Sequence, residues 1–216
     1  EPIQAEGGDN HFRPEFLRAL RDVAHENDAL LVFDEVQTGF GLTGRMWAHQ
    51  HDDIRPDLLA FGKKVQVCGM MGGGRIDEEP ENVFATSSRL NSTWGGNLVD
   101  MVRSRRYLEI MVEDRLVERA AENGAILKQG LETLQAERPD VVSNARGRGL
   151  MCAIDLPDGA ARGAVVQRAF DLGMMILPCG TRSIRFRPPL DVTAAEIGDA
   201  LGIVKKAIDL GAAKSA

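Results

Sequence analysis

Two short apolar segments, each followed by a charged residue, constrain the fold of this chain more than any other feature. The first is "ALLVF" (Ala29–Phe33), followed by Asp34, and the second is "DLLAFG" (Asp57–Gly62), followed by Lys63. Runs of this length and composition are typical of β-strands that are buried on both faces. The segment "RPEFLRALRDVAHEND" (13–28) has helical spacing of its apolar residues and a proline near its start, so a helix precedes the first strand. This alternation predicts an α/β sheet.

The charged residues at the ends of these strands are candidates for a functional site. Ligands of open α/β sheets bind at the carboxyl ends of the strands, where both Asp34 and Lys63 stand. A desolvated lysine amine can form a Schiff base with a carbonyl compound. A buried carboxylate can keep the ring nitrogen of pyridoxal phosphate protonated. Asp34 and Lys63 therefore fit pyridoxal-phosphate chemistry, although their spacing alone also fits two solvated surface charges.

The second half of the chain has a different pattern. We expect helical structure from residue 98 to about 137, broken near 113–114 and 123–124, and further helices over 161–172 and 193–210. Thr193 and Glu196 form a capping box, Thr-x-x-Glu, at the start of the last helix. Strands are predicted for "GRGLMCAIDL" (147–156), "GMMILPC" (173–179) and "SIRFRPPL" (183–190). This order predicts a small α+β domain over 101–216. We place the domain boundary near residue 100 and interpret residues 1–100, which carry Asp34 and Lys63, as the carboxyl-terminal part of a large cofactor-binding domain.

The composition is that of an ordinary globular protein. Of 216 residues, 44% are hydrophobic and 27% are charged, and the net charge is −6. The chain has no basic stripe for nucleic acid, since Arg103, Arg105 and Arg106 fit a solvated helix face. It has no apolar run of membrane-spanning length and no recognisable secretory signal, so we expect no membrane association and a cytoplasmic location. Three widely spaced cysteines favour buried thiols in a reducing compartment over disulfides.

Other polar patterns have simpler interpretations than catalysis. His49 and His51 have no well-spaced third ligand, so no metal site is predicted. "GMMGGG" (69–74) lacks the frame of a phosphate-binding loop and is interpreted as a flexible turn. "RGRG" (146–149) is interpreted as a turn that enters a strand. Glu35 must face the side of the strand opposite to Asp34, so we assign it a supporting role and no catalysis.

A set of motifs along the whole chain resembles the class III aminotransferases, which are pyridoxal-phosphate enzymes of fold type I. The motifs are "EPIQAEGG" (1–8), "LLVFDEVQTGFGLTGRMWAHQH" (30–51), "PDLLAFGKK" (56–64), "STWGGN" (92–97) and "RFRPPL" (185–190). The details "FGKKVQVCG", "NVFATSSRLNSTWGGN" and "GRGLMCAIDLP" resemble the lysine-specific members of this family more than those that use ornithine or 4-aminobutyrate. The implied fold is α/β, with part of the large domain, whose sheet is mostly parallel, followed by a small α+β domain.

The resemblance implies a role for each matching residue at the cofactor. Lys63 would form the Schiff base with pyridoxal phosphate and shuttle the substrate proton, with its neighbour Lys64 as the alternative. Asp34 would pair with the pyridinium nitrogen. Val36 would pack on the ring. The two remaining cofactor residues would be Gln37, at the ring hydroxyl, and Thr93, at the phosphate across the interface of a homodimer.

The resemblance also implies a gate for two different substrates. Arg185 would hold a carboxylate of 2-oxoglutarate or glutamate, with Arg187 as the alternative on the same strand face. Glu6 would neutralise Arg185 when the ε-amino end of L-lysine, which has no adjacent carboxylate, occupies the site. An unpaired buried guanidinium would otherwise be costly. The implied products are 2-aminoadipate 6-semialdehyde and glutamate.

The chain also departs from the resembling family. Members run roughly twice its length, and their amino-terminal half carries a phosphate-binding loop, a ring-stacking aromatic residue and residues for the substrate's α-carboxylate. We therefore expect this chain to correspond to the carboxyl-terminal half of such an enzyme. The alternatives are an ω-aminotransferase with ornithine or 4-aminobutyrate as donor, and a truncated module that only binds partners.

Overall fold

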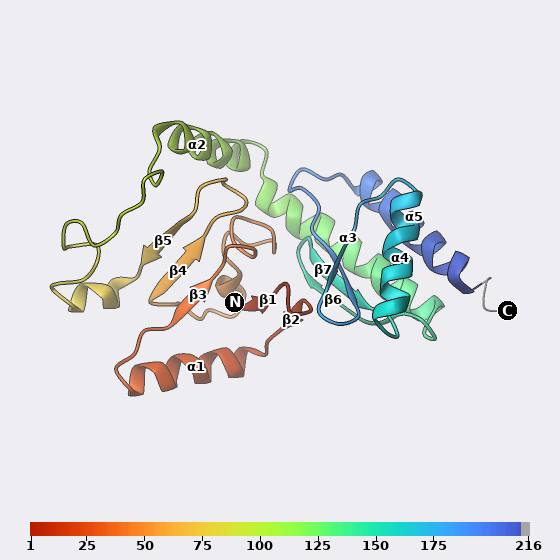
Figure 1. The fold of residues 1–216 in the computed structure, drawn as a ribbon, viewed down its shortest axis with the longest axis horizontal. Coiled ribbons are helices and arrows are strands. Elements are labelled where there is room, and N and C mark those ends of the chain that lie inside the picture. The colour runs from red at the N-terminus through yellow and green to blue at the C-terminus, as the bar shows by residue number, and fades with distance from the viewer. Residues whose placement is uncertain (213–216) are drawn as a thin grey trace. The chain divides into compact units, whose positions relative to one another are not determined.

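The computed structural model describes residues 1–212, which form two compact units (Figure 1). The first unit comprises residues 1–2, 12–40 and 47–115, and the second comprises residues 3–11, 41–46 and those from 116 onward. The boundaries of these units differ from those of the expected domains 1–100 and 101–216, because the short segments 3–11 and 41–46 pack with the second half of the chain. The two-domain assignment remains a prediction.

The first unit contains a three-stranded sheet and flanking helices. The sheet has the order β3-β4-β5, with β3 and β4 parallel and β4 and β5 antiparallel. Its elements are α1 (Pro14–Glu26), β3 (Val32–Asp34), the 3₁₀ helix η1 (Ala48–His51), β4 (Leu58–Phe61), β5 (Gly69–Gly72), the 3₁₀ helix η2 (Gly74–Glu78) and α2 (Leu98–Glu113). The helix and both strands predicted before residue 62 are confirmed, and proline stands at the first turn of α1.

Strand β3 is buried on one face only, which corrects the expectation of two buried faces. Leu31 and Phe33 are buried, whereas Val32 between them is 51% exposed. The buried side chains contact Leu17 of α1 and Ile54 in a small apolar cluster. In this unit α1 therefore covers one face of β3, and β3 is also an edge strand of its sheet.

The glycine-rich segment at 69–74 is not the flexible turn that we predicted. Residues 69–72 form β5, which pairs antiparallel with β4, and η2 follows. A Cβ atom at Gly69 would lie 2.6 Å from the ring of Phe61 on the facing strand. Glycine is thus required here by the close approach of the strands, and this requirement conceals the strand signal in the sequence.

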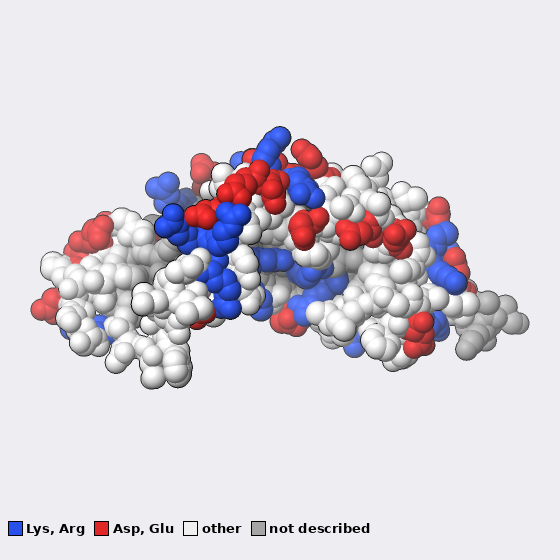
Figure 2. Space-filling model, turned by 90° about the horizontal axis from the view of Figure 1, so that it is seen from above, with Lys and Arg blue, Asp and Glu red and all other residues white. Residues whose placement is uncertain are grey.

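Helix α2 carries the arginines that we predicted to form a solvated helix face. Arg103 pairs with Asp100 at 2.6 Å, and Arg105 pairs with Glu109 at 2.9 Å on exposed sites. On the face of the molecule shown in Figure 2, basic and acidic side chains are interspersed in the same way. The prediction of a solvated helix face is confirmed.

The second unit is a four-stranded antiparallel sheet with three helices. The sheet order is β6-β7-β9-β8, and a two-stranded ribbon of β1 and β2 belongs to the same unit. Helix α3 packs along β6 and β7, α4 packs along β8 and β9, and α5 packs against both helices. The elements are β1 (Ile3–Gln4), β2 (Asn10–His11), α3 (Leu116–Glu137), β6 (Ser143–Arg148), β7 (Met151–Asp155), α4 (Gly159–Asp171), β8 (Leu177–Cys179), β9 (Ser183–Phe186) and α5 (Ala194–Ala212).

Three predictions for this unit are wrong. Helix α3 continues through Asn123 and Gly124, where we expected a break. "RGRG" belongs mostly to strand β6, and the single strand expected over 147–156 instead comprises the end of β6, the turn of a hairpin between β6 and β7, and β7 itself. A Cβ atom at Gly124 would lie 2.1 Å from the carbonyl carbon of Gly149, which has a φ of 54°. Gly124 is therefore a packing glycine rather than a helix breaker. The break near 113–114 is confirmed, because α2 ends at Glu113.

The core of the second unit is a single large apolar cluster. It joins residues from α3, β7, α4, β9 and α5, including Leu131, Ile154 and Val204, each fully buried. Cys152 is also in this core, and burial raises the pKa of its thiol to about 12. Cys179 is buried as expected, but Cys68 of the first unit is exposed. Within residues 1–212, none of the helices has both the length and the apolar character needed to cross a bilayer.

Candidate active site

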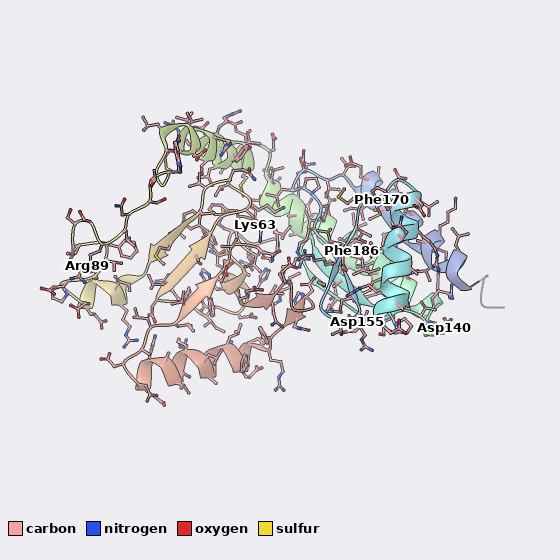
Figure 3. The ribbon with its side chains drawn as sticks, in the orientation of Figure 1. Lys63, Arg89, Asp140, Asp155, Phe170 and Phe186 are labelled. Carbon is pink, nitrogen blue, oxygen red and sulfur yellow. The ribbon has the colours of Figure 1, made fainter. Side chains whose placement is uncertain are left out.

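The parallel pairing of β3 and β4 explains why Asp34 and Lys63 belong to one edge of the sheet. Asp34, the last residue of β3, pairs in register with Ala60 of β4, and Lys63 follows shortly after β4 ends. Both side chains are exposed in the described chain. Figure 3 shows Lys63 beyond the end of β4. A primary amine and a carboxylate are thus presented at neighbouring strand ends, where an α/β sheet binds ligands.

The residues after each strand hold this edge in a defined shape. The backbone N–H of Val36 donates to Oδ1 of Asp34 at 2.9 Å, which orients the carboxylate. A Cβ atom at Gly62 would lie 3.5 Å from Cγ1 of Val36 and 3.1 Å from Sγ of Cys68. The absence of a side chain at Gly62 therefore leaves room for Cys68, and Val36 lies at ordinary contact distance from the same turn. Val36 and Gln37 are both partly buried.

Glu35 is a structural anchor of the segment that follows β3. Its carboxylate is fully buried and accepts hydrogen bonds from Oγ1 of Thr38 at 3.0 Å and the N–H of Ala48 at 2.6 Å. The backbone N–H of His49 also donates to it at 3.0 Å, and Nδ1 of His49 lies 2.9 Å from it. The predicted supporting role for Glu35 thus has a specific form: it ties η1 to the residues beside Asp34. His49 therefore has a structural role as a partner of the Glu35 carboxylate.

Thr93 lies apart from these residues in the chain. It is exposed in the segment between η2 and α2, and Ser92 beside it accepts a hydrogen bond from the N–H of Gly95 at 3.1 Å. Within residues 1–212, no hydrogen bond or ion pair joins Thr93 to Asp34 or Lys63. Its expected role at a cofactor phosphate across a dimer interface therefore remains a prediction.

In the second unit, the structure brings Glu6 and Arg185 together. Arg185 lies in β9, and its Nη1 donates to Oε1 of Glu6 at 2.5 Å. Glu6 is in the segment that joins β1 to β2, and its backbone carbonyl accepts from the N–H of Gly180 at 2.9 Å. The arginine side chain is 10% exposed and the glutamate side chain is 65% exposed. A nearly buried cation thus has an exposed counter-ion.

The alternative arginine has a different partner. Nη1 of Arg187 donates to Oδ2 of Asp9 at 3.1 Å, and Nε2 of His11 lies 3.6 Å from the other oxygen of this carboxylate. Burial alone raises the pKa of Asp9, but His11 and Arg187 outweigh burial, and the net pKa lies below its ordinary value. Asp9 is fully buried. Sequence reasoning did not single out Asp9, because its partner is 178 positions away in the chain.

Comparison with known proteins identifies the class to which this arrangement belongs. The family "Aminotransferase class-III" matches residues 1–208. The chain is therefore a member of the class III aminotransferases. The chain spans about half the length of the curated relatives that it matches.

Several relatives can be named. The chain is 59% identical over 202 residues to the L-lysine-epsilon aminotransferase of Amycolatopsis lactamdurans, covering 93% of this chain and 45% of the relative. It is 40% identical over 192 residues to the mitochondrial 4-aminobutyrate aminotransferase of Sus scrofa, covering 88% of this chain and 37% of that protein.

Solved structures show the same likeness. The chain superposes on "Lysine aminotransferase from M. tuberculosis in the internal aldimine form" with a TM-score of 0.95 and 55% identity, covering 97% of this chain and 48% of that one. An ornithine aminotransferase from Toxoplasma gondii gives a TM-score of 0.83 at 30% identity, with 96% of this chain and 49% of that chain covered. The expected fold class, the fold-type-I architecture of this family, is confirmed.

Proposed function

We propose that this chain is part of a pyridoxal-phosphate-dependent enzyme that transfers the ε-amino group of L-lysine to 2-oxoglutarate. The observation that carries the proposal is the presence of Asp34 and Lys63 at the ends of adjacent parallel strands in a class III aminotransferase chain. Lysine as donor is supported by identities of 55–59% with lysine-epsilon aminotransferases, against 40–41% with 4-aminobutyrate aminotransferases.

The residues at the sheet edge fit the cofactor by their chemistry. Lys63 offers an exposed primary amine for the aldehyde, and Asp34 offers an oriented carboxylate for the pyridinium nitrogen. Val36 offers a partly buried aliphatic side chain for the ring face. Gln37 would bind the ring hydroxyl, and Thr93 would bind the phosphate. When bound, pyridoxal phosphate supplies an aldehyde for condensation with amines and a ring that accepts electrons.

The residues of the chain then have separate tasks. The Nζ amine of Lys63 would anchor the cofactor and would be placed to accept and return the substrate proton. The carboxylate of Asp34 would pair with the ring nitrogen. Arg185 binds a carboxylate of 2-oxoglutarate, and Glu6 neutralises Arg185 while lysine is the substrate. We further propose that the enzyme is a cytoplasmic homodimer with Thr93 contributed across the interface.

The donor can be tested in single-turnover half-reactions of the holoenzyme with L-lysine, L-ornithine and 4-aminobutyrate. We expect the fastest amino transfer from lysine, and its product should be a semialdehyde. A faster reaction with ornithine or 4-aminobutyrate would show that the donor assignment is wrong. Absence of transfer from all three, together with no covalent label on Lys63 after borohydride reduction, would instead support the non-catalytic alternative.

A further inference from the structure

The second unit contains two arginine–carboxylate pairs that share the same two segments. Arg185 and Arg187 lie at and just beyond the end of β9, and their partners Glu6 and Asp9 lie in the short segment around the β1–β2 turn. Both guanidinium groups therefore face the same segment. In the proposed gate, one of these cations binds the substrate carboxylate, and the other must stay neutralised by a different group.

The two pairs differ in the carboxylate rather than in the arginine. The side chains of Arg185 and Arg187 are similarly buried, with 10% and 14% exposed. The side chain of Glu6 is 65% exposed, whereas that of Asp9 is 0% exposed. Glu6 can therefore turn into solvent and keep its charge solvated. Asp9 cannot leave Arg187 without placing a buried charge out of contact with its counter-ion, which is strongly unfavourable.

A third arginine, Arg146, holds the backbone around Asp9 in place through two hydrogen bonds. Nε of Arg146 donates to the carbonyl of Asp9 at 2.8 Å, and Nη2 donates to the carbonyl of Gly8 at 2.5 Å. Arg146 itself pairs with Asp155 of β7 at 2.9 Å. The segment thus stays in place when the side chain of Glu6 moves. Asp9 therefore stays paired with Arg187 whether Glu6 contacts Arg185 or has turned into solvent.

We propose that Asp9 determines which cation receives the substrate carboxylate, by keeping Arg187 neutralised throughout the reaction. This inference rests on the proposed use of Glu6 and Arg185 as a gate. With Asp9 in place, only Arg185 is available, and one mobile glutamate is enough to compensate it. Without Asp9, two cations face a donor whose reacting end has no carboxylate, and Glu6 can neutralise only one of them.

The test compares the two half-reactions of the holoenzyme in Asp9→Asn. Asparagine preserves the shape of the side chain and tolerates the positive φ of 55° at this position. We expect kcat/KM for lysine to fall at least tenfold, because Arg187 is left uncompensated, and kcat/KM for glutamate to change less than threefold. The matched control is Asp140→Asn, which removes an exposed partner of Arg138 at 3.3 Å and should leave the ratio of the two values unchanged.

A binding measurement tests the inference without turnover. Glutarate is an unreactive dicarboxylate, and we expect the holoenzyme with Asp9→Asn to bind it at least threefold more tightly in calorimetry than the wild type does. Unchanged or weaker binding would overturn the inference, as would equal losses in both half-reactions together with a lower unfolding temperature. The latter result would give Asp9 a purely structural role. An error in the lysine assignment would appear separately, as a different donor preference of the wild type.

The double variant Asp9→Asn/Arg187→Met keeps the inference testable if the single variant does not fold. It removes both charges of the buried pair, which is tolerated far better than removing one. We expect its ratio of lysine to glutamate kcat/KM to lie within threefold of the wild-type ratio. A tenfold loss confined to the glutamate half-reaction would show that Arg187 is itself the carboxylate receptor, which would contradict the proposal.

Discussion

The two compact units differ in how completely they bury their own apolar residues. The second unit has one continuous core, with fully buried side chains on α3, β7, β9 and α5. The first unit has a cluster of four buried residues, while Trp94, Leu98 and Val99 remain between 71% and 81% exposed. Large exposed apolar side chains in sequence neighbours are typical of surfaces that bind other protein.

The two proposed sets of functional residues lie on different units. The amine and carboxylate proposed for the cofactor are on the first unit, and the arginine–carboxylate pairs proposed as a gate are on the second. Variants in the first unit should affect every step that uses the cofactor. Variants of the gate should distinguish one substrate from the other.

The largest expected effect is that of Lys63→Ala. In the proposed mechanism the Nζ amine is both the covalent anchor and the proton carrier, so both half-reactions of the holoenzyme should slow by about 10³-fold or more. Rapid-mixing measurements with lysine and with glutamate check this. The control is Lys64→Ala, for which we expect less than a tenfold change. A larger loss in Lys64→Ala than in Lys63→Ala would reverse the assignment of the two lysines.

A gate variant should instead separate the two half-reactions. In Glu6→Ala, Arg185 has lost its counter-ion while lysine is bound, and the exposed position of Glu6 limits the cost. We expect the lysine half-reaction to slow about tenfold, which corresponds to about 1.4 kcal/mol. The glutamate half-reaction should change little, because its carboxylate takes the place of Glu6. Equal effects on both substrates would remove the gate from the mechanism.

A pair of glycine variants probes the packing of the second unit. Gly124→Ala places a methyl group 2.1 Å from the backbone of Gly149, so α3 and the β6–β7 turn must move apart. We expect a loss of about 1–3 kcal/mol in the free energy of unfolding. Gly163→Ala, on the exposed face of α4 with nothing within 4 Å of the new Cβ, should instead stabilise by about 0.5–1 kcal/mol. Urea titrations compare the two, and similar values would show that α3 does not pack as described.

The sequence predicted local features well and distant contacts poorly. The strands before Asp34 and Lys63 could be found because an apolar run and its charged end are adjacent in the chain. Strand β5 was missed because its first glycine, Gly69, packs against the ring of Phe61 on the facing strand, which the sequence pattern does not reveal. The role of Gly124 was misjudged for the same reason, since Gly149 is remote in sequence.

The gate shows the same limit. The pairing of Glu6 with Arg185, 179 positions apart, was expected only because of the family resemblance, and no local pattern could have provided it. The pairing of Asp9 with Arg187 was not expected at all, because an aspartate after two glycines resembles an ordinary turn residue. Ion pairs that join the ends of a chain become visible only when the fold is known.

The smallest predicted effect tests whether the two units unfold separately. Oγ1 of Thr193 accepts from the N–H of Glu196 at 3.2 Å, and the Glu196 carboxylate accepts from the N–H of Thr193 at 2.8 Å, which confirms the predicted capping box of α5. Thr193→Ala should cost about 1 kcal/mol. The matched variant is Asn97→Ala, which removes the cap of α2 in the first unit, where Oδ1 accepts from the N–H of Val99 at 2.9 Å. In calorimetry of the holoenzyme, each variant should shift a different transition, because each unit has its own core. If both variants lower a single transition equally, the units unfold as one body, and the contrast between their cores has no thermodynamic consequence.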